Sequence, residues 1–194
     1  MKQHTISNAQ LQISILNKGV EISSIQSLKT GKEYIWNADP AIWGSHAPVL
    51  FPAIGSFKNE ECTIDGKTYR IPKHGFIRHN EDMLLSQSTE TALHFQLEYS
   101  EKTLAVYPYQ FRFHISFELH ENRLIVSHKV ENLDDKAIHF SLGAHPAFNC
   151  PINEGESYSD YYLEFETTET AARTLLSSNG LITDKTEAVL ENSN

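Results

Sequence analysis

Phe111-Arg112-Phe113-His114-Ile115-Ser116-Phe117-Glu118-Leu119 is the stretch of sequence that decides the fold class. Apolar and polar side chains alternate strictly along it, which is the two-residue period of a strand with one buried face. The apolar side chains are expected on the core face and the polar ones on the solvent face, as in an antiparallel sheet. The stretch therefore predicts a long, half-buried antiparallel strand.

Similar patterns surround this strand on both sides. The runs Ala92–Tyr99 and Leu124–Val130 are two further long strands, and Glu121-Asn122 is a turn before the second of them. Nearer the N-terminus the strands expected are 11–15, 20–25 with 33–36 as its hairpin partner, and a small hairpin over 63–69 around Asp-Gly. No helix of normal length is indicated, so the sequence predicts an all-β protein that opens with a meander.

Less regular segments complete the chain. Pro48–Gly55 favours a short buried strand or a loop, because Pro52 would break any helix that began at Pro48. Ala137–Leu142 and Leu163–Glu166 are expected to be strands, and Leu181–Leu190 a hairpin or a short helix. Because no linker or repeat interrupts residues 1–194, we expect a single domain.

Composition narrows the classes of function. Sixteen basic and 25 acidic side chains give a net charge of −9, which argues against nucleic acid or an anionic membrane as the main partner. The two cysteines, Cys62 and Cys150, lie far apart and indicate neither a zinc site nor a disulfide framework. With no signal-like apolar segment at the start and no long apolar run, a cytoplasmic protein is expected.

Two histidine loops are the candidate site. Pro72–Arg78 places His74 beside a glycine and four residues before an arginine, although such a loop alone is more often an ordinary surface turn. A second histidine, His145, lies between Gly143 and Pro146 at the end of a predicted strand. Histidine titrates near neutrality, so the pair suits acid–base chemistry.

Other chemistries are poorly supported. His74 and His79 with Glu81 and Asp82 could be assembled into a metal site, but they match no ligand signature. No GxSxG elbow is present, and neither cysteine has a histidine beside it in the sequence. No metal is therefore expected.

Four motifs follow one another along the chain: Pro48–Pro52 with Gly55, Pro72–Arg78, Tyr107–Phe111 and Gly143–Phe148. In their order and approximate spacing they resemble the aldose 1-epimerase (galactose mutarotase) family, and in particular its LacX-like branch. The resemblance extends over nearly the whole chain. It implies a large antiparallel β-sandwich of the galactose mutarotase-like supersandwich type, with a sugar held on its broad face.

The resemblance also implies a mechanism. His145 would act as general acid on the ring oxygen of a hexose, and His74 would assist there. A glutamate from a later strand would remove the anomeric proton, so that the ring opens and recloses as the other anomer without a cofactor. Arg78 would bind sugar hydroxyls or a phosphate, and Phe76 and Lys58 complete the expected substrate-binding set. Lys58 lies close to where relatives commonly carry an arginine.

One family motif is missing from the sequence. The catalytic glutamate of the family lies in a motif resembling Cys-Ile-Glu-Pro-Trp, and Glu187 and Glu191, the last acids here, have a different context. The sequence therefore suggests a fragment of a longer epimerase, or a truncated chain, whose sandwich is incomplete at the C-terminus. Exposed strand edges would then favour a homo-oligomer. A non-catalytic sugar-binding remnant without the base is the alternative function.

Overall fold

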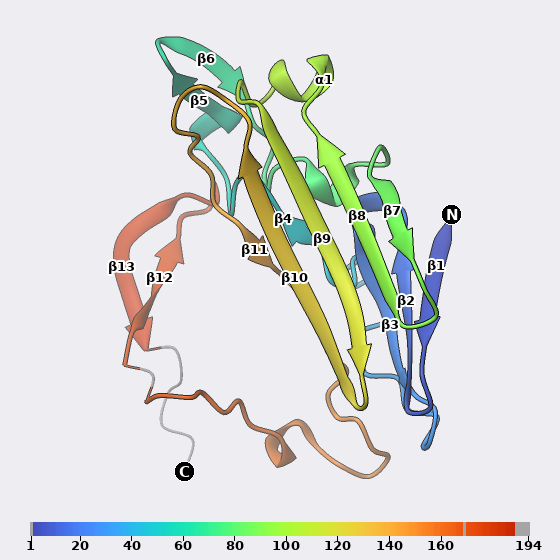
Figure 1. Cartoon of the computed structure of the whole chain (residues 1–194). Coiled ribbons are helices and arrows are strands. Elements are labelled where there is room, and N and C mark those ends of the chain that lie inside the picture. The colour runs from blue at the N-terminus through green and yellow to red at the C-terminus, as the bar shows by residue number, and fades with distance from the viewer. Residues whose placement is uncertain (1, 169, 189–194) are drawn as a thin grey trace.

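The computed structural model describes residues 2–168 and 170–188, which form mainly antiparallel strands (Figure 1). The first three strands, β1 (Gln3–Ser7), β2 (Leu11–Leu16) and β3 (Glu21–Ser27), make a meander. A four-stranded antiparallel sheet follows in the order β10-β9-β8-β7, from β7 (Leu84–Ser88), β8 (Ala92–Glu98), β9 (Phe111–His120) and β10 (Arg123–Asn132). The strands expected around the alternating stretch are thus confirmed.

The remaining elements are short. Strand β4 (Val49–Leu50) pairs with β11 (Gly143–Ala144), β5 (Glu61–Ile64) with β6 (Lys67–Arg70), and β12 (Ala172–Leu176) with β13 (Ile182–Ala188). The helical turns are η1 (Lys18–Val20), η2 (Lys58–Glu60), η3 (Ile77–His79), α1 (Glu101–Leu104) and η4 (Tyr158–Asp160). None of the helices in the described residues is long and apolar enough to cross a membrane.

The core lies between the two main sheets. Alternate side chains of β9, from Phe111 to Leu119, are buried, and they share one apolar cluster with the isoleucines of β1 and β2. The sheets also meet directly where the ring of His4 contacts that of Phe95, with centroids 5.2 Å apart. This packing of two antiparallel sheets confirms the predicted all-β sandwich.

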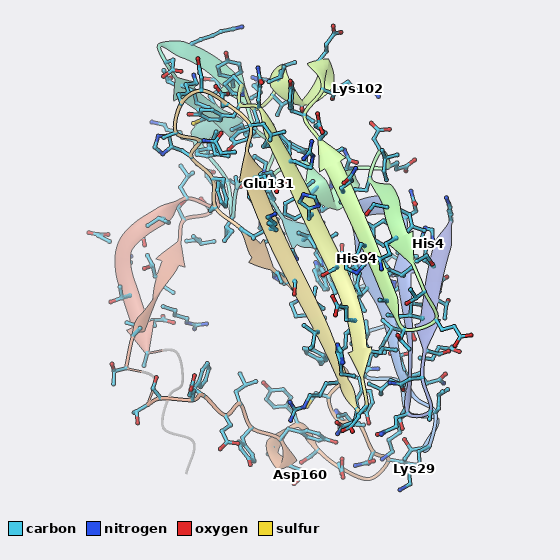
Figure 2. The ribbon with its side chains drawn as sticks, in the orientation of Figure 1. His4, Lys29, His94, Lys102, Glu131 and Asp160 are labelled. Atoms are coloured by element: carbon cyan, nitrogen blue, oxygen red, sulfur yellow. The ribbon has the colours of Figure 1, made fainter. Side chains whose placement is uncertain are left out.

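The opposite face of the four-stranded sheet carries the polar half of the alternating pattern. Figure 2 shows the labelled His94 and Glu131 on this face, turned away from β1–β3. Glu131 accepts hydrogen bonds from Lys129 and His114, which hold the pKa of its carboxyl at about 2. Ion pairs of this kind satisfy the charges without burying them.

Four sequence predictions need correction or completion. Residues 33–36 begin as a hairpin partner of β3 through a bridge at Glu33, but Ile35 then pairs with Phe148. Residues 137–142 and 163–166 form no strand, because their backbones do not make the repeated hydrogen bonds to a neighbouring segment that a strand requires. The segment predicted over 181–190 is one arm of the β12–β13 hairpin as far as residue 188; residues 189 and 190 lie outside the described part.

Strand β10 is the terminal strand of its sheet. An apolar hollow of about 330 Å³ borders β10 and is lined by side chains from β3, β9 and β10 together with Pro146 and Phe148. Phe148 and Phe140 are 60% and 45% exposed. The open edge and apolar surface expected from the sequence are therefore present in the described chain.

Candidate active site

The loop that carries His74 lies against the backbone of Phe51. The N–H groups of Phe76 and Ile77 both donate to the Phe51 carbonyl, at 3.0 and 3.3 Å. Gly75 makes this contact possible, because its φ is +71° and a Cβ built there would lie 2.1 Å from the Phe51 oxygen. The glycine beside the histidine is thus required by a close approach of two backbones.

Hydrogen bonds fix the imidazole of His74 in one tautomer. The backbone N–H of His74 donates to the Gly55 carbonyl at 2.8 Å, and the Gly55 N–H donates to Nδ1 of the His74 ring at 3.2 Å. Because Nδ1 is an acceptor, a neutral His74 carries its proton on Nε2. Burial lowers the pKa of His74, and the positive charges of Lys73, Arg78 and His145 lower it further.

His145 directly follows β11, in a stretch whose backbone is hydrogen-bonded to residues 46–48 and to Trp36. The backbone N–H of His145 donates to the Pro48 carbonyl at 3.1 Å. Further along the chain, the N–H of Ala147 donates to the His46 carbonyl, and the Ala147 carbonyl accepts the N–H of Trp36. The imidazole is exposed, and its ring centroid lies 4.9 Å from that of Trp43. Both candidate histidines are therefore attached by their backbones to the segment 48–55.

Arg78 completes the group. It belongs to η3, whose backbone packs on η1 so closely that a Cβ at Gly19 would lie 2.6 Å from the Arg78 carbonyl oxygen. The guanidinium Nη2 lies 3.4 Å from the Ser45 hydroxyl oxygen, to which it donates, and Nε is buried without a hydrogen-bond partner. A buried polar atom without a partner is unusual in a folded protein, which marks the surroundings of this guanidinium as a special environment.

The structure brings three of the five predicted site residues together. His74 and Arg78 share one loop, and the charge of His145 acts on His74. Phe76 instead directs its ring to the aromatic core, with centroid distances of 6.2 Å to Phe111 and 6.3 Å to Phe51. Lys58 is exposed in η2. Within the described ranges, no hydrogen bond or ring contact joins either side chain to the two histidines.

A metal centre has no support in the described chain. No group of three or more histidine, cysteine, aspartate or glutamate side chains is arranged to hold an ion there. The chemistry that this arrangement offers is proton transfer and hydrogen bonding by two imidazoles beside a fixed positive charge.

Sequence reasoning missed the loop that borders the site. Trp43 and Ser45 lie in it and contact His145 and Arg78 respectively. The signal was the aromatic residue between Pro40 and the Gly44-Ser45 pair, in a stretch too irregular to suggest a strand. A contact between residues 102 positions apart has no local signature, which is why only the structure shows it.

The fold defines the class of protein. The structure aligns with that of a galactose mutarotase related enzyme from Lactobacillus acidophilus with a TM-score of 0.86 and 38% identity, over 91% of this chain and 59% of that one. A galactose mutarotase-like protein from Lactobacillus casei aligns with a TM-score of 0.74 and 32% identity, over 79% of this chain and 52% of the other. The described chain thus has a galactose mutarotase-like β-sandwich fold.

The sequence comparison defines the family. The aldose 1-epimerase pattern matches residues 2–193, and the LacX proteins of Lactococcus lactis subsp. lactis, plasmid and chromosomal, are 35% identical over 173 residues. The chain belongs to the aldose 1-epimerase family. The aligned residues make up 86% of this chain and 57% of the LacX proteins, so it spans little more than half the length of these curated relatives.

Proposed function

We propose that this protein acts as an aldose 1-epimerase that interconverts the α and β anomers of a hexose such as galactose or glucose. The observation that carries the proposal is that His74 and His145, 71 residues apart in sequence, are both hydrogen-bonded through their backbones to the segment 48–55, with Arg78 in the same loop as His74. Opening a sugar ring at neutral pH requires a proton donor at the ring oxygen. Imidazoles are suited to that task.

The two histidines have different roles in this proposal. His145, exposed at the end of its segment, is the general acid that protonates the ring oxygen. His74 stays neutral and donates a hydrogen bond from Nε2, because a proton on Nδ1 would face the Gly55 N–H, a second donor. The lowered pKa of His74 agrees with this division of roles.

Arg78 is the proposed anchor for the substrate. Its guanidinium donates to the Ser45 hydroxyl, and its terminal N–H groups are the proposed donors to sugar hydroxyls or to the phosphate of a hexose phosphate. Substrate contacts by Lys58 and Phe76 stay predictions, and the packing of the Phe76 ring favours a supporting role for it. We propose that no cofactor takes part.

The general base is the part of the mechanism that these residues do not supply. The resemblance implies a glutamate for it, in a motif that we do not find in the sequence, and the curated relatives are nearly twice as long as their matched part. A non-catalytic sugar-binding protein that keeps the two histidines is therefore the second candidate. A homo-oligomer, a cytoplasmic location and a single domain over 1–194 stay predictions.

Polarimetry on freshly dissolved α-glucose and α-galactose tests the proposal. The protein is expected to accelerate mutarotation above the buffer rate, and His145→Ala to lose at least about tenfold in kcat, as expected when a general acid is removed. His74→Gln should retain more activity, since it can still donate a hydrogen bond. Mutarotation at the buffer rate with saturable sugar binding would establish the second candidate instead.

A further inference from the structure

The loop between Trp36 and Ala47 touches the exposed imidazole of His145. The indole of Trp43 lies against that ring with centroids 4.9 Å apart and planes inclined by 42°. No hydrogen bond to the His145 ring is found within the part of the chain that the structure describes. An exposed ring without such a bond rotates freely unless packing restrains it.

Hydrogen bonds hold the backbone of Trp43 in place. Its carbonyl accepts a hydrogen bond from Trp36 Nε1–H at 2.9 Å, and its N–H donates to the Asp39 carbonyl at 2.8 Å. At the far end of the loop, Glu21 Oε1 accepts the N–H groups of His46 and Ala47 at 2.6 and 2.8 Å. Hydrogen bonds to a carboxylate are among the stronger ones in proteins. They hold the end of the loop that carries Trp43 in a fixed position.

We infer that Trp43 is a positioning residue for His145. The indole packs against the imidazole and so restricts its rotation, and Ser45 in the same loop accepts a hydrogen bond from Arg78. An aromatic face also attracts a cation within about 6 Å, so the contact persists when the imidazole carries a proton. This inference rests on the proposed function, in which His145 delivers the proton.

Kinetics test the positioning role. Removing the ring in Trp43→Ala leaves the acid free to rotate, and misplacing a catalytic group by about 1 Å costs up to roughly a hundredfold in rate. We expect kcat to fall about tenfold or more with KM little changed, and Trp43→Phe to recover most of the rate. Tyr158→Ala, which removes an aromatic ring that is 79% exposed, is the matched control and should behave like wild type.

Fluorescence tests the contact independently of activity. A protonated imidazole quenches an adjacent indole, so acidification should lower the emission of the wild-type protein. This acid-dependent component should disappear in Trp43→Phe, which keeps Trp36, and in His145→Gln, which keeps both tryptophans. Circular dichroism at each pH confirms that the variants are folded.

Three outcomes would overturn the inference. A raised KM with unchanged kcat in Trp43→Ala would make the indole a sugar platform. An acid-dependent emission that survives His145→Gln would show that the rings do not interact in solution. A wild-type protein without mutarotase activity but with the expected quenching would refute the proposed function, and the positioning role with it, while leaving the ring contact established.

Discussion

Gly75→Ala tests whether the close approach of two backbones builds the histidine loop. At φ = +71° a residue with a Cβ costs about 1–2 kcal/mol. The new Cβ would also lie 2.1 Å from the Phe51 oxygen and 2.6 Å from the Pro52 nitrogen, closer than the 3.0 Å below which such contacts are essentially never seen. The loop must therefore move away.

The movement puts at risk the two hydrogen bonds that Phe51 accepts from Phe76 and Ile77, each contributing about 1 kcal/mol. We therefore expect Gly75→Ala to lower the free energy of unfolding by about 3–4 kcal/mol, the sum of the backbone and hydrogen-bond costs. It should also lower the mutarotation rate, because His74 moves with the loop. Urea unfolding followed by tryptophan fluorescence and far-UV circular dichroism measures the first effect.

Gly66→Ala is the matched control for this substitution. Gly66 also has a positive φ, +78°, but nothing lies within 4 Å of a Cβ built there. It should therefore show only the backbone cost, about 1–2 kcal/mol. If the two variants lose the same stability within about 0.5 kcal/mol, a typical error of such comparisons, the close approach contributes nothing and the reasoning is refuted.

Three further predictions concern single side chains. Burial lowers the pKa of His128 below its unfolded value of about 6.5, so the folded state binds fewer protons and loses stability as pH falls below that value. His128→Leu should therefore narrow the difference between the urea unfolding midpoints measured at pH 7.5 and pH 5. An unchanged difference would contradict this. Tyr107→Phe, which removes the hydroxyl that donates to the His139 carbonyl at 3.0 Å, should cost about 1 kcal/mol in the same unfolding assay, and no loss would show that the bond is made equally well to water. Arg78→Lys should raise KM for the hexose severalfold with kcat nearly unchanged, because lysine cannot reproduce the fork held by Ser45; an unaltered KM would remove Arg78 from the substrate site.

Regular alternation was the most informative signal for the fold. The run from Phe111 to Leu119 predicts β9 and its buried face correctly, because burial of one face imposes a two-residue period on the sequence itself. The Asp65-Gly66 turn likewise predicts the β5–β6 hairpin, since both residues have the positive φ that such turns require.

Pairing between distant segments escaped prediction. Residues 137–142 look like a strand because apolar residues recur there, yet Tyr107 binds the His139 carbonyl and the backbone joins no sheet. Ile35 was expected to pair with the strand over 20–25, but it forms a bridge with Phe148, which follows β11 in the chain. The position of β11 in the fold determines this pairing, and the local sequence does not.

The sequence suggests residues for the candidate site but not their surroundings, and their roles stay predictions. One loop with a histidine beside glycine is more often an ordinary turn, and His74, Arg78 and His145 became candidates because two such loops occur in motifs that resemble one family. The packing of Phe76 towards Phe111 was not visible, since an aromatic residue in a loop serves a core as readily as a ligand.

Because both histidine loops are hydrogen-bonded to residues 48–55, the length of that segment affects the distance between the two histidines. His145 is tied to the carbonyl of Pro48 and His74 to that of Gly55, so the number of residues between the two ties sets the spacing of the imidazoles. A residue inserted between the two hydrogen bonds would therefore displace one histidine relative to the other, and hydrogen bonds tolerate only small changes of distance. A substitution within segment 48–55 would change its stability, whereas an insertion or deletion would change the relative position of the two imidazoles.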